Sequence, residues 1–287
     1  MDLSKYCAVN CELFGNQAEY FESEIVPYWQ SIYDSLVARA SLTPGSRVLD
    51  VGTGTGETAL RAAGAVGEKG NVVAIDLQDE MLRIARRKAI ERRLDNVEFR
   101  RMPLEHLDLP DSVFDAAVGN YSLCCTLYYE ACLEEIIRVL SPGGRLTYNH
   151  GGPSDSVASQ VIFDIFEKYR PKKPSKRLRE FRESDERQVK SIDKYRIPKN
   201  TLRVLSEIGY ADPQAALVPR TITYRGPEDF VERMLSYDWK LEAEEMSQKD
   251  LLTFREEAVG ELRELSSGQE FVVKDDMVFY TGVKGSR

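Results

Sequence analysis

The sequence has few of the residues that mark disulfide scaffolds, metal sites and membrane spans. Its five cysteines are an odd number without a scaffold spacing, and it has only two histidines. The longest stretch without charge, residues 116–129, contains Asn120, Ser122 and Thr126, and is too short and too polar to cross a bilayer. These gaps predict a reduced, cytoplasmic protein with no membrane span.

The chain also lacks an excess of positive charge. It has 47 acidic and 39 basic residues among 287, a formal net charge of -8 and a pI near 5.1. Binding to nucleic acid depends on a positive field, so a general nucleic-acid binder is not expected. Residues 1–16 show no basic start followed by an apolar run, which predicts no signal peptide.

Short apolar runs alternate with amphipathic segments over the first half of the chain. This rhythm predicts an α/β fold, a Rossmann-like, doubly wound and mostly parallel sheet with helical cap insertions. Two later runs, 215–224 and 271–283, bring the expected number of strands to seven, the last as an edge strand or hairpin. The first five runs, read as buried strands, are 47–52, 71–76, 96–101, 112–120 and 145–150.

The same rhythm divides the chain into segments, and no internal repeat interrupts it. We expect a cofactor-binding core, a basic helical lid and a C-terminal part that completes the sheet and carries a helical cap at about 226–270. The apolar spacing of 18–40 predicts a helix broken near Pro27, as part of an N-terminal cover. The expected segments are 1–40 for the cover, 41–150 for the core, 151–196 for the lid and 197–287 for the completion.

A glycine-rich segment follows the first predicted strand and opens a helix. It contains Gly52, Gly54 and Gly56, and glycines there let a ligand lie against main-chain atoms. Asp76 follows 20 residues after Gly56, at the end of the second predicted strand. An acid at that place can accept hydrogen bonds from both hydroxyls of a ribose, so the segment predicts a nucleoside site.

The charges around this loop indicate which nucleoside binds. A dinucleotide loop reads GxGxxG, but here the third glycine position holds Glu57, whose carboxylate would repel a pyrophosphate. Asp50 adds a second negative group just before the loop. A cationic ligand without phosphate suits both acids, and S-adenosylmethionine has a ribose, an ammonium and a sulfonium. A glycine-rich turn without a ligand is the alternative.

Three segments in order resemble class I S-adenosylmethionine-dependent methyltransferases. Residues 48–60 (VLDVGTGTGETAL) resemble the first motif of that family, 72–89 the second, and 134–146 the segment that leads into the fifth strand. The amino-acid sequence of these segments is most similar to the ubiquinone/menaquinone-biosynthesis type and to related small-molecule methyltransferases. The resemblance covers 41–150 well, and 197–225 and the last strand weakly.

The resemblance implies a set of cofactor-binding residues. The methionine end would be held by the loop and the acid before it, and Asp76 would bind the ribose. In many relatives an acid after the third strand contacts the adenine, but Pro103 stands there, so the contact falls to the Leu104 backbone or to Glu105. The implied residues, with the residue that ends the fourth strand, are Asp50, Gly52, Gly54, Gly56, Asp76, Leu77, Met81, Leu104, Glu105 and Asn120.

Methyl transfer from a sulfonium is a direct displacement, so the candidate catalytic residues are those that could position or deprotonate an acceptor. His150 ends the fifth predicted strand and could act as a base, or be a structural histidine bonded to the loop backbone. Tyr20 lies on the aromatic N-terminal cover, where relatives carry a tyrosine. Tyr121 follows the fourth strand in Asn-Tyr-Ser, which is not the Asn-Pro-Pro-Tyr of amino methylation on adenine or glutamine.

Two other features left alternatives open. Cys124, Cys125 and Cys132 could indicate soft-metal or arsenic chemistry, but no CxxC is present and adjacent cysteines point to different sides, so no metal site is predicted. Cys7 and Cys11 are four residues apart. Residues 168–182 carry eight basic side chains and one acid; they could form an anion clamp for a carboxylate or phosphate of the acceptor, or a solvated connector.

The sequence therefore predicts S-adenosylmethionine-dependent methyl transfer to carbon, oxygen or nitrogen of a small molecule. The acceptor could be anionic, and the protein a homo-oligomer. The competing functions are an NAD-dependent oxidoreductase and a methyltransferase-fold cyclase or binding protein that transfers no methyl group.

Overall fold

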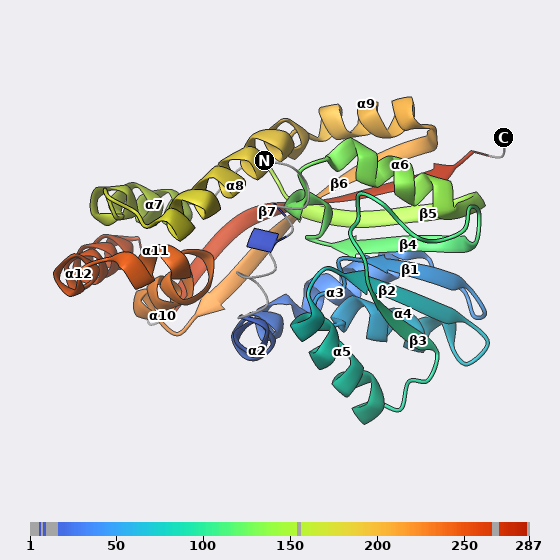
Figure 1. The fold of residues 1–287 in the computed structure, drawn as a ribbon, viewed down its shortest axis with the longest axis horizontal. Coiled ribbons are helices and arrows are strands. Elements are labelled where there is room, and N and C mark those ends of the chain that lie inside the picture. The colour runs from blue at the N-terminus through green and yellow to red at the C-terminus, as the bar shows by residue number, and fades with distance from the viewer. Residues whose placement is uncertain (1–5, 7, 10–16, 154–155, 266–269, 286–287) are drawn as a thin grey trace. The chain divides into compact units, whose positions relative to one another are not determined.

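β-Branched and aliphatic runs form a seven-stranded sheet in the computed structural model, which describes residues 6, 8–9, 17–153, 156–265 and 270–285 (Figure 1). The strand order is β3-β2-β1-β4-β5-β7-β6. β1 to β5 pair in parallel, and β7 pairs antiparallel with β5. The bounds are β1 Arg47–Val51, β2 Asn71–Asp76, β3 Val97–Arg101, β4 Phe114–Asn120, β5 Leu140–Gly151, β6 Tyr210–Tyr224 and β7 Phe271–Lys284.

This topology confirms the predicted Rossmann-like, doubly wound and mostly parallel sheet. One detail differs, because the last strand is not at an edge. β7 is inserted between β5 and β6, and its residues 274–276 continue the strand instead of turning. The strand order reverses between β1 and β4, and a parallel sheet opens a crevice for ligands at the carboxyl ends of such strands.

The chain forms two compact units. Unit 1 comprises 1–152, 186–218 and 277–287, and unit 2 comprises 153–185 and 219–276. Residues 17–40 of the expected N-terminal cover and residues 186–196 of the expected lid lie in unit 1. The predicted segment bounds stay a prediction.

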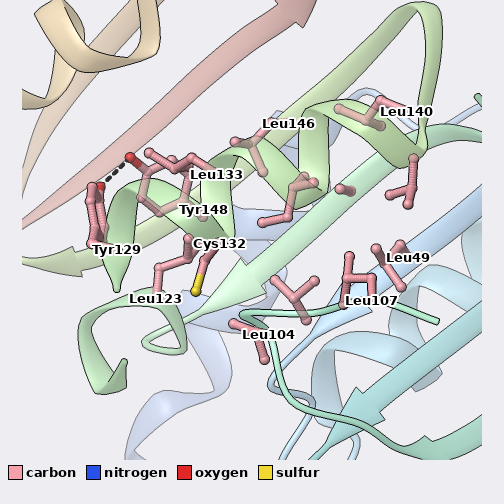
Figure 2. Packing of buried hydrophobic residues seen from close by; sticks show 14 of the residues in the cluster. Leu49, Leu104, Leu107, Leu123, Tyr129, Cys132, Leu133, Leu140, Leu146 and Tyr148 are labelled. Carbon is pink, nitrogen blue, oxygen red and sulfur yellow. Dashed lines mark hydrogen bonds between the residues drawn. The ribbon is translucent and has the colours of Figure 1, made fainter. Parts of the chain in front are cut away.

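Two helical layers cover the sheet of unit 1, and the alternation of strand side chains explains them. Val48, Val72 and Val118 face small residues of α4. Leu49 and Leu146 pack with residues of α6 on the other face (Figure 2), and Val73 belongs to the same cluster, which α9 also joins. The helices are α2 Ala18–Tyr20, α3 Gln30–Ala40, α4 Glu57–Val66, α5 Asp79–Glu91, α6 Tyr129–Val139 and α9 Pro198–Ile208, with α8 Lys176–Ile192 shared between the units.

The N-terminal segment is irregular between α2 and α3. A π-helical turn, Phe21–Ile25, leads into a 3-10 turn, Val26–Trp29, that contains Pro27. Proline lacks the N–H that an uninterrupted helix needs, which explains the predicted break. Ala18 and Phe21 pack on Met81 and Ile84 of α5, so this segment is attached beside the second strand.

Unit 2 is built around aromatic rings. Phe166 stacks on Trp239 with 4.1 Å between ring centroids, and Phe254 meets both rings at a steep angle. The helices of unit 2 are α7 Val157–Tyr169, α10 Pro227–Arg233, α11 Lys240–Glu245 and α12 Gln248–Glu264, with a π-helical turn Met234–Asp238.

Within the described ranges, no helix is long and apolar enough to cross a membrane.

Candidate functional site

Three left-handed glycines shape the loop between β1 and α4. Gly52, Gly54 and Gly56 have φ of 65°, 55° and 90°, which L side chains rarely adopt. A Cβ on Gly52 would lie 2.4 Å from the Cβ of Ser122, and one on Gly56 would lie 2.8 Å from the Cβ of Ala85. At Gly54 nothing is nearer than 3.9 Å. Gly52 and Gly56 thus allow the loop to pack closely against Ser122 and Ala85. Gly54 leaves space next to the loop backbone that a ligand can occupy.

Asp76 at the end of β2 fastens this loop. One carboxylate oxygen accepts the Gly54 N–H at 2.8 Å, and the other accepts the Gln78 N–H at 2.9 Å. Burial raises the pKa of Asp76, although these backbone donors oppose the rise. Each oxygen has a lone pair left, so the carboxylate can still accept hydroxyl donors from a ligand.

Asp50, at the end of β1, is a fully buried acid with one unpaired oxygen. Its Oδ2 accepts the Thr53 hydroxyl at 2.6 Å, while Oδ1 has no hydrogen-bond partner among the described residues. Burial raises the pKa of Asp50 to about 7, and the charge of Asp76 adds to the rise, against the hydrogen bond from Thr53. Two acids that are costly to ionise favour a ligand that brings positive charge.

Glu57 begins α4, and its negative charge is compensated by three basic side chains of the protein. The Nζ of Lys88 lies 2.5 Å and the guanidinium of Arg92 lies 2.6 Å from its carboxylate, and Arg61 forms a third ion pair. Burial would raise the pKa of Glu57, but these three cations lower it to about 2. The expected repulsion of a pyrophosphate by a free carboxylate at this helix start is therefore weaker than the sequence indicated.

The residues expected around the adenine lie near the ends of β2 and β3. Leu77 is half-buried, and its carbonyl accepts the Arg101 Nε at 3.1 Å. Met81 is buried under Ala18 and Phe21 of the N-terminal segment, and Leu104 is buried in the layer of α6. Glu105 is half-buried, and burial raises the pKa of its carboxyl.

Asn120 and Tyr121 lie where β4 ends. The Asn120 Oδ1 accepts the Asn149 Nδ2 at 2.8 Å, and the Tyr121 N–H donates to the Asn149 Oδ1 at 3.1 Å. Tyr121 has φ of 50°, and its ring meets Trp29 edge-on with 4.6 Å between centroids. The next residue, Ser122, is the one that Gly52 faces, so this turn lies against the glycine loop.

His150 points into a tyrosine cluster on the side of the sheet that carries α6. It is 1% exposed, with Tyr280 at 5.0 Å and Tyr148 at 6.2 Å between ring centroids. Its Nδ1 contacts the Gly151 carbonyl at 2.8 Å, whereas Nε2 has no partner among the described residues. Burial lowers the pKa of His150, which favours the neutral ring.

Tyr20, the predicted lid residue, ends the short helix α2 and is half-buried. The neighbouring Phe21 is the side chain nearest to the open space at Gly54. The N-terminal segment therefore reaches the glycine loop within unit 1.

The chain matches the family described as "Methyltransferase domain" over residues 42–190, just over half of its length. The chain belongs to this methyltransferase family.

Curated relatives include the ubiquinone/menaquinone biosynthesis C-methyltransferases UbiE of Ectopseudomonas mendocina and Teredinibacter turnerae. The first is 37% identical over 37% of this chain and 42% of its own, and the second is 36% identical over 44% and 51%. The chain thus spans about half, or less, of the length of these relatives. Among solved structures, the BH2331 protein of Bacillus halodurans C-125 has a TM-score of 0.59 at 20% identity, covering 89% of this chain and 99% of its own.

Cys124 and Cys125 lie beside the turn that follows β4, and Cys132 is buried in α6. The thiols of Cys124 and Cys125 are 3.9 Å apart and both donate to the Tyr121 carbonyl, although adjacent residues were expected to point apart. The hydrogen bond with Cys125, together with burial, raises the pKa of Cys124. Among the described residues no three metal-ligating side chains gather, and Cys7 and Cys11 lie outside the described residues.

Half of the basic side chains in the stretch 168–182 form ion pairs within unit 2. Arg170 and Arg182 bind the buried Glu242, with N to O distances of 2.7 and 2.5 Å, and Lys168 binds Glu257 at 2.5 Å. Lys172 and Arg179 donate to backbone carbonyls. This pairing favours a structural connector over an anion clamp.

Sequence reasoning missed two features of the candidate site. Asn149 was read only as a residue of the fifth strand, and the cations around Glu57 were not connected to it. Lys88 of α5 and Arg92, the residue that caps the end of α5, are four residues apart, a sign of one helix face. The partner of that face could not be read from the spacing alone.

Proposed function

We propose that this chain transfers a methyl group from S-adenosylmethionine to a small-molecule acceptor. The observation that carries this proposal is the pair of buried acids, Asp50 and Asp76, on either side of a glycine loop whose middle residue, Gly54, is open. Family membership and the match to C-methyltransferases support it. The unpaired Asp50 Oδ1 and the raised pKa values of both acids fit a ligand that is cationic.

Each residue has a role in this proposal. Asp76 binds the ribose hydroxyls, while Asp50 and the loop of Gly52, Gly54 and Gly56 hold the charged methionine end. Leu77, Met81, Leu104 and Glu105 form the adenine wall, with Asn120 on the methionine side. These assignments rest on the carboxyl-edge position of the loop and of β4.

When bound, S-adenosylmethionine supplies an electrophilic methyl group that a nucleophile displaces in line. The contribution of the chain is to hold both reactants and exclude water, since orientation supplies much of the rate. The Trp29 and Tyr121 rings contact each other beside the loop and can stabilise a cationic centre. Tyr20 would close the N-terminal side.

His150 has two candidate roles. A base at the acceptor needs its Nε2 to be reached, and Nε2 is the unpaired nitrogen, but its burial among tyrosines favours a structural role. His150→Phe decides between them: a base predicts a large fall in kcat and loss of its pH dependence, whereas a structural histidine predicts lower thermal stability with kcat retained.

The acceptor is a small molecule whose attacking atom is a carbon, an oxygen or a nitrogen. Because the relatives are named C-methyltransferases of ubiquinone and menaquinone biosynthesis, carbon acceptors are the first to test. An anionic acceptor has weak support, since the basic stretch is already paired. A homo-oligomeric assembly and a cytoplasmic location stay predictions.

Titration calorimetry with S-adenosylmethionine and with NADH tests the proposal, followed by radiolabelled methyl transfer into cell extract. We expect binding of S-adenosylmethionine and labelling of a small-molecule fraction. Binding of NADH alone would overturn the proposal in favour of an oxidoreductase. Cofactor binding without transfer to any acceptor would instead favour the cyclase or binding-protein alternative.

A further inference from the structure

Asn149 connects the two residues at the end of β4 and is completely buried. It lies directly opposite Asn120 in the parallel pair of β4 and β5. Its Oδ1 accepts the Tyr121 N–H at 3.1 Å, and its Nδ2 donates to the Asn120 Oδ1 at 2.8 Å. The side chain thus takes the place of the next rung of the strand pairing, where β4 leaves the sheet.

One backbone group fixes the polarity of this whole chain of hydrogen bonds. The Tyr121 N–H can only donate, so the atom of Asn149 that faces it must be the oxygen. The Asn149 amide nitrogen then faces Asn120, and the atom of Asn120 that meets it must be an oxygen too. The Asn120 Nδ2 remains as the group that the turn offers to a ligand.

The turn that carries this donor is held in a strained conformation. Tyr121 has φ of 50°, in the left-handed region that disfavours a residue with a Cβ. Its N–H is bound by Asn149, and its carbonyl accepts the thiols of Cys124 and Cys125 at 3.4 and 3.3 Å. A strained backbone conformation that is fixed by hydrogen bonds at both the N–H and the carbonyl of one residue is typical of a pre-organised site.

The same turn interlocks with the glycine loop. A Cβ on Gly52 would collide with the Cβ of Ser122, and a Cβ on Gly119 would lie 2.7 Å from the Ser122 Oγ. That hydroxyl and the Asp50 Oδ1 are buried without a hydrogen-bond partner among the described residues. Two buried polar atoms on elements that adjoin the glycine loop therefore have no hydrogen-bond partner among the described residues.

The charges at the methionine end of the proposed cofactor site require a donor. Asp50 and Asp76 suit the ammonium and sulfonium of the cofactor, but they repel its carboxylate. That carboxylate needs N–H or O–H groups, and the Asn120 Nδ2 and the Ser122 Oγ are of that kind. A charge-assisted hydrogen bond to a carboxylate is among the stronger ones in proteins.

We propose that Asn149 is a positioning residue that directs the Asn120 Nδ2 toward the carboxylate of the bound S-adenosylmethionine. This inference rests on the proposed function. Asn149 itself does not touch the ligand. It selects which end of the Asn120 amide the ligand meets, and it holds Tyr121 in the left-handed turn.

The substitution Asn149→Asp reverses this selection. A carboxylate at position 149 still accepts the Tyr121 N–H, but it can no longer donate to Asn120. The Asn120 amide must then turn its Nδ2 toward the new carboxylate and present its oxygen to the ligand. Thr147→Val is the matched control, because Thr147 is buried two residues earlier on the same strand and its hydroxyl has no partner among the described residues.

The measurement is the ratio of calorimetric affinities for S-adenosylmethionine and for its decarboxylated analogue. Both probes carry the sulfonium and the ribose, so the ratio isolates the carboxylate. We expect Asn149→Asp to lower the ratio at least about tenfold, as for loss of a hydrogen bond to a charged group. We expect Thr147→Val to leave it unchanged.

A ratio for Asn149→Asp within about twofold of the parent overturns the inference, including the case in which only acceptor turnover falls. If Asn149→Asp does not fold, Asn120→Leu decides, because residue 120 is half-buried and its loss should lower the same ratio. A parent protein that fails to bind S-adenosylmethionine contradicts the proposed function, whereas a parent that binds with an insensitive ratio contradicts this inference alone.

Discussion

The Gly54 backbone N–H donates a 2.8 Å hydrogen bond to the carboxylate of Asp76, which lies at the end of the neighbouring strand. The acid assigned to the ribose therefore also sets the shape of the loop assigned to the methionine end. In the proposed function, loop conformation and ribose recognition depend on the same side chain, so we expect a substitution at 76 to affect both.

Asp76→Ala should weaken binding of S-adenosylmethionine by at least about tenfold, because a charge-assisted acceptor and a loop contact are lost together. Calorimetry measures the effect. Asp76→Asn is the matched variant: it keeps an acceptor for one backbone N–H and should fall between Ala and the parent. Equal affinity for the Ala variant and the parent would show that the site is misassigned.

Binding of the cofactor should depend on Asp50 near neutral pH. The pKa of Asp50 is raised to about 7, so the carboxylate is protonated below that pH and loses its attraction for a cation. Affinity for S-adenosylmethionine should rise from pH 6 to pH 8 in the parent and stay flat in Asp50→Asn. A parallel rise in the variant would place the titrating group elsewhere.

The same acid should destabilise the ligand-free protein at high pH. Its folded pKa of about 7 lies above the ordinary value of 3.8, so the folded state binds more protons between those values. Stability should thus decrease as pH rises from about 4 to 7, and Asp50→Asn should unfold later than the parent at pH 8, by on the order of 2–4 kcal/mol. Urea unfolding at pH 5 and pH 8 measures this. An equal gap at both pH values would argue against a raised pKa.

Gly52→Ala should disable the loop. A Cβ there meets Ser122 at 2.4 Å and is strained at φ of 65°, so we expect loss of cofactor binding and lower thermal stability. Gly64→Ala in α4 is the control, since nothing lies within 4 Å of its added Cβ. That change should stabilise the helix by up to about 1 kcal/mol. Normal cofactor affinity in Gly52→Ala would contradict the packing described for Ser122.

Glu57→Gln should destabilise the protein by about 2 kcal/mol, because the buried Lys88 loses one of its two carboxylate partners and keeps only Glu22, at 2.7 Å. The pKa of Glu57 is lowered to about 2, so its stabilisation is present above the unfolded pKa and lost as pH falls toward 2. Glu80→Gln removes a surface pair with Arg83 and should cost under about 1 kcal/mol. Similar losses for both variants in urea unfolding would refute the special role of Glu57.

The parts of the site that could be predicted are those that depend on neighbours along the chain. Gly52, Gly54 and Gly56 follow a strand directly, and Asp76 ends the next one, so spacing along the chain reflects proximity in the sheet. The seven strands were predictable for the same reason.

Other parts depend on contacts between distant segments. Nothing near Asn149 in the chain indicates that it accepts the N–H of Tyr121, because that contact exists only once β4 and β5 pair. The same limit applies to the basic stretch, whose partners Glu242 and Glu257 come from helices more than 50 residues away. Charge in a sequence shows which side chains need a partner, not which one they find.

The interior position of β7 has a consequence for synthesis. β7 follows every other strand along the chain, yet it lies between β5 and β6, with Tyr280 opposite Tyr148. On the ribosome, β5 must therefore wait with an open edge until residues 277–284 emerge. A chain truncated before Met277 should aggregate, and chaperone demand should be greatest in that interval.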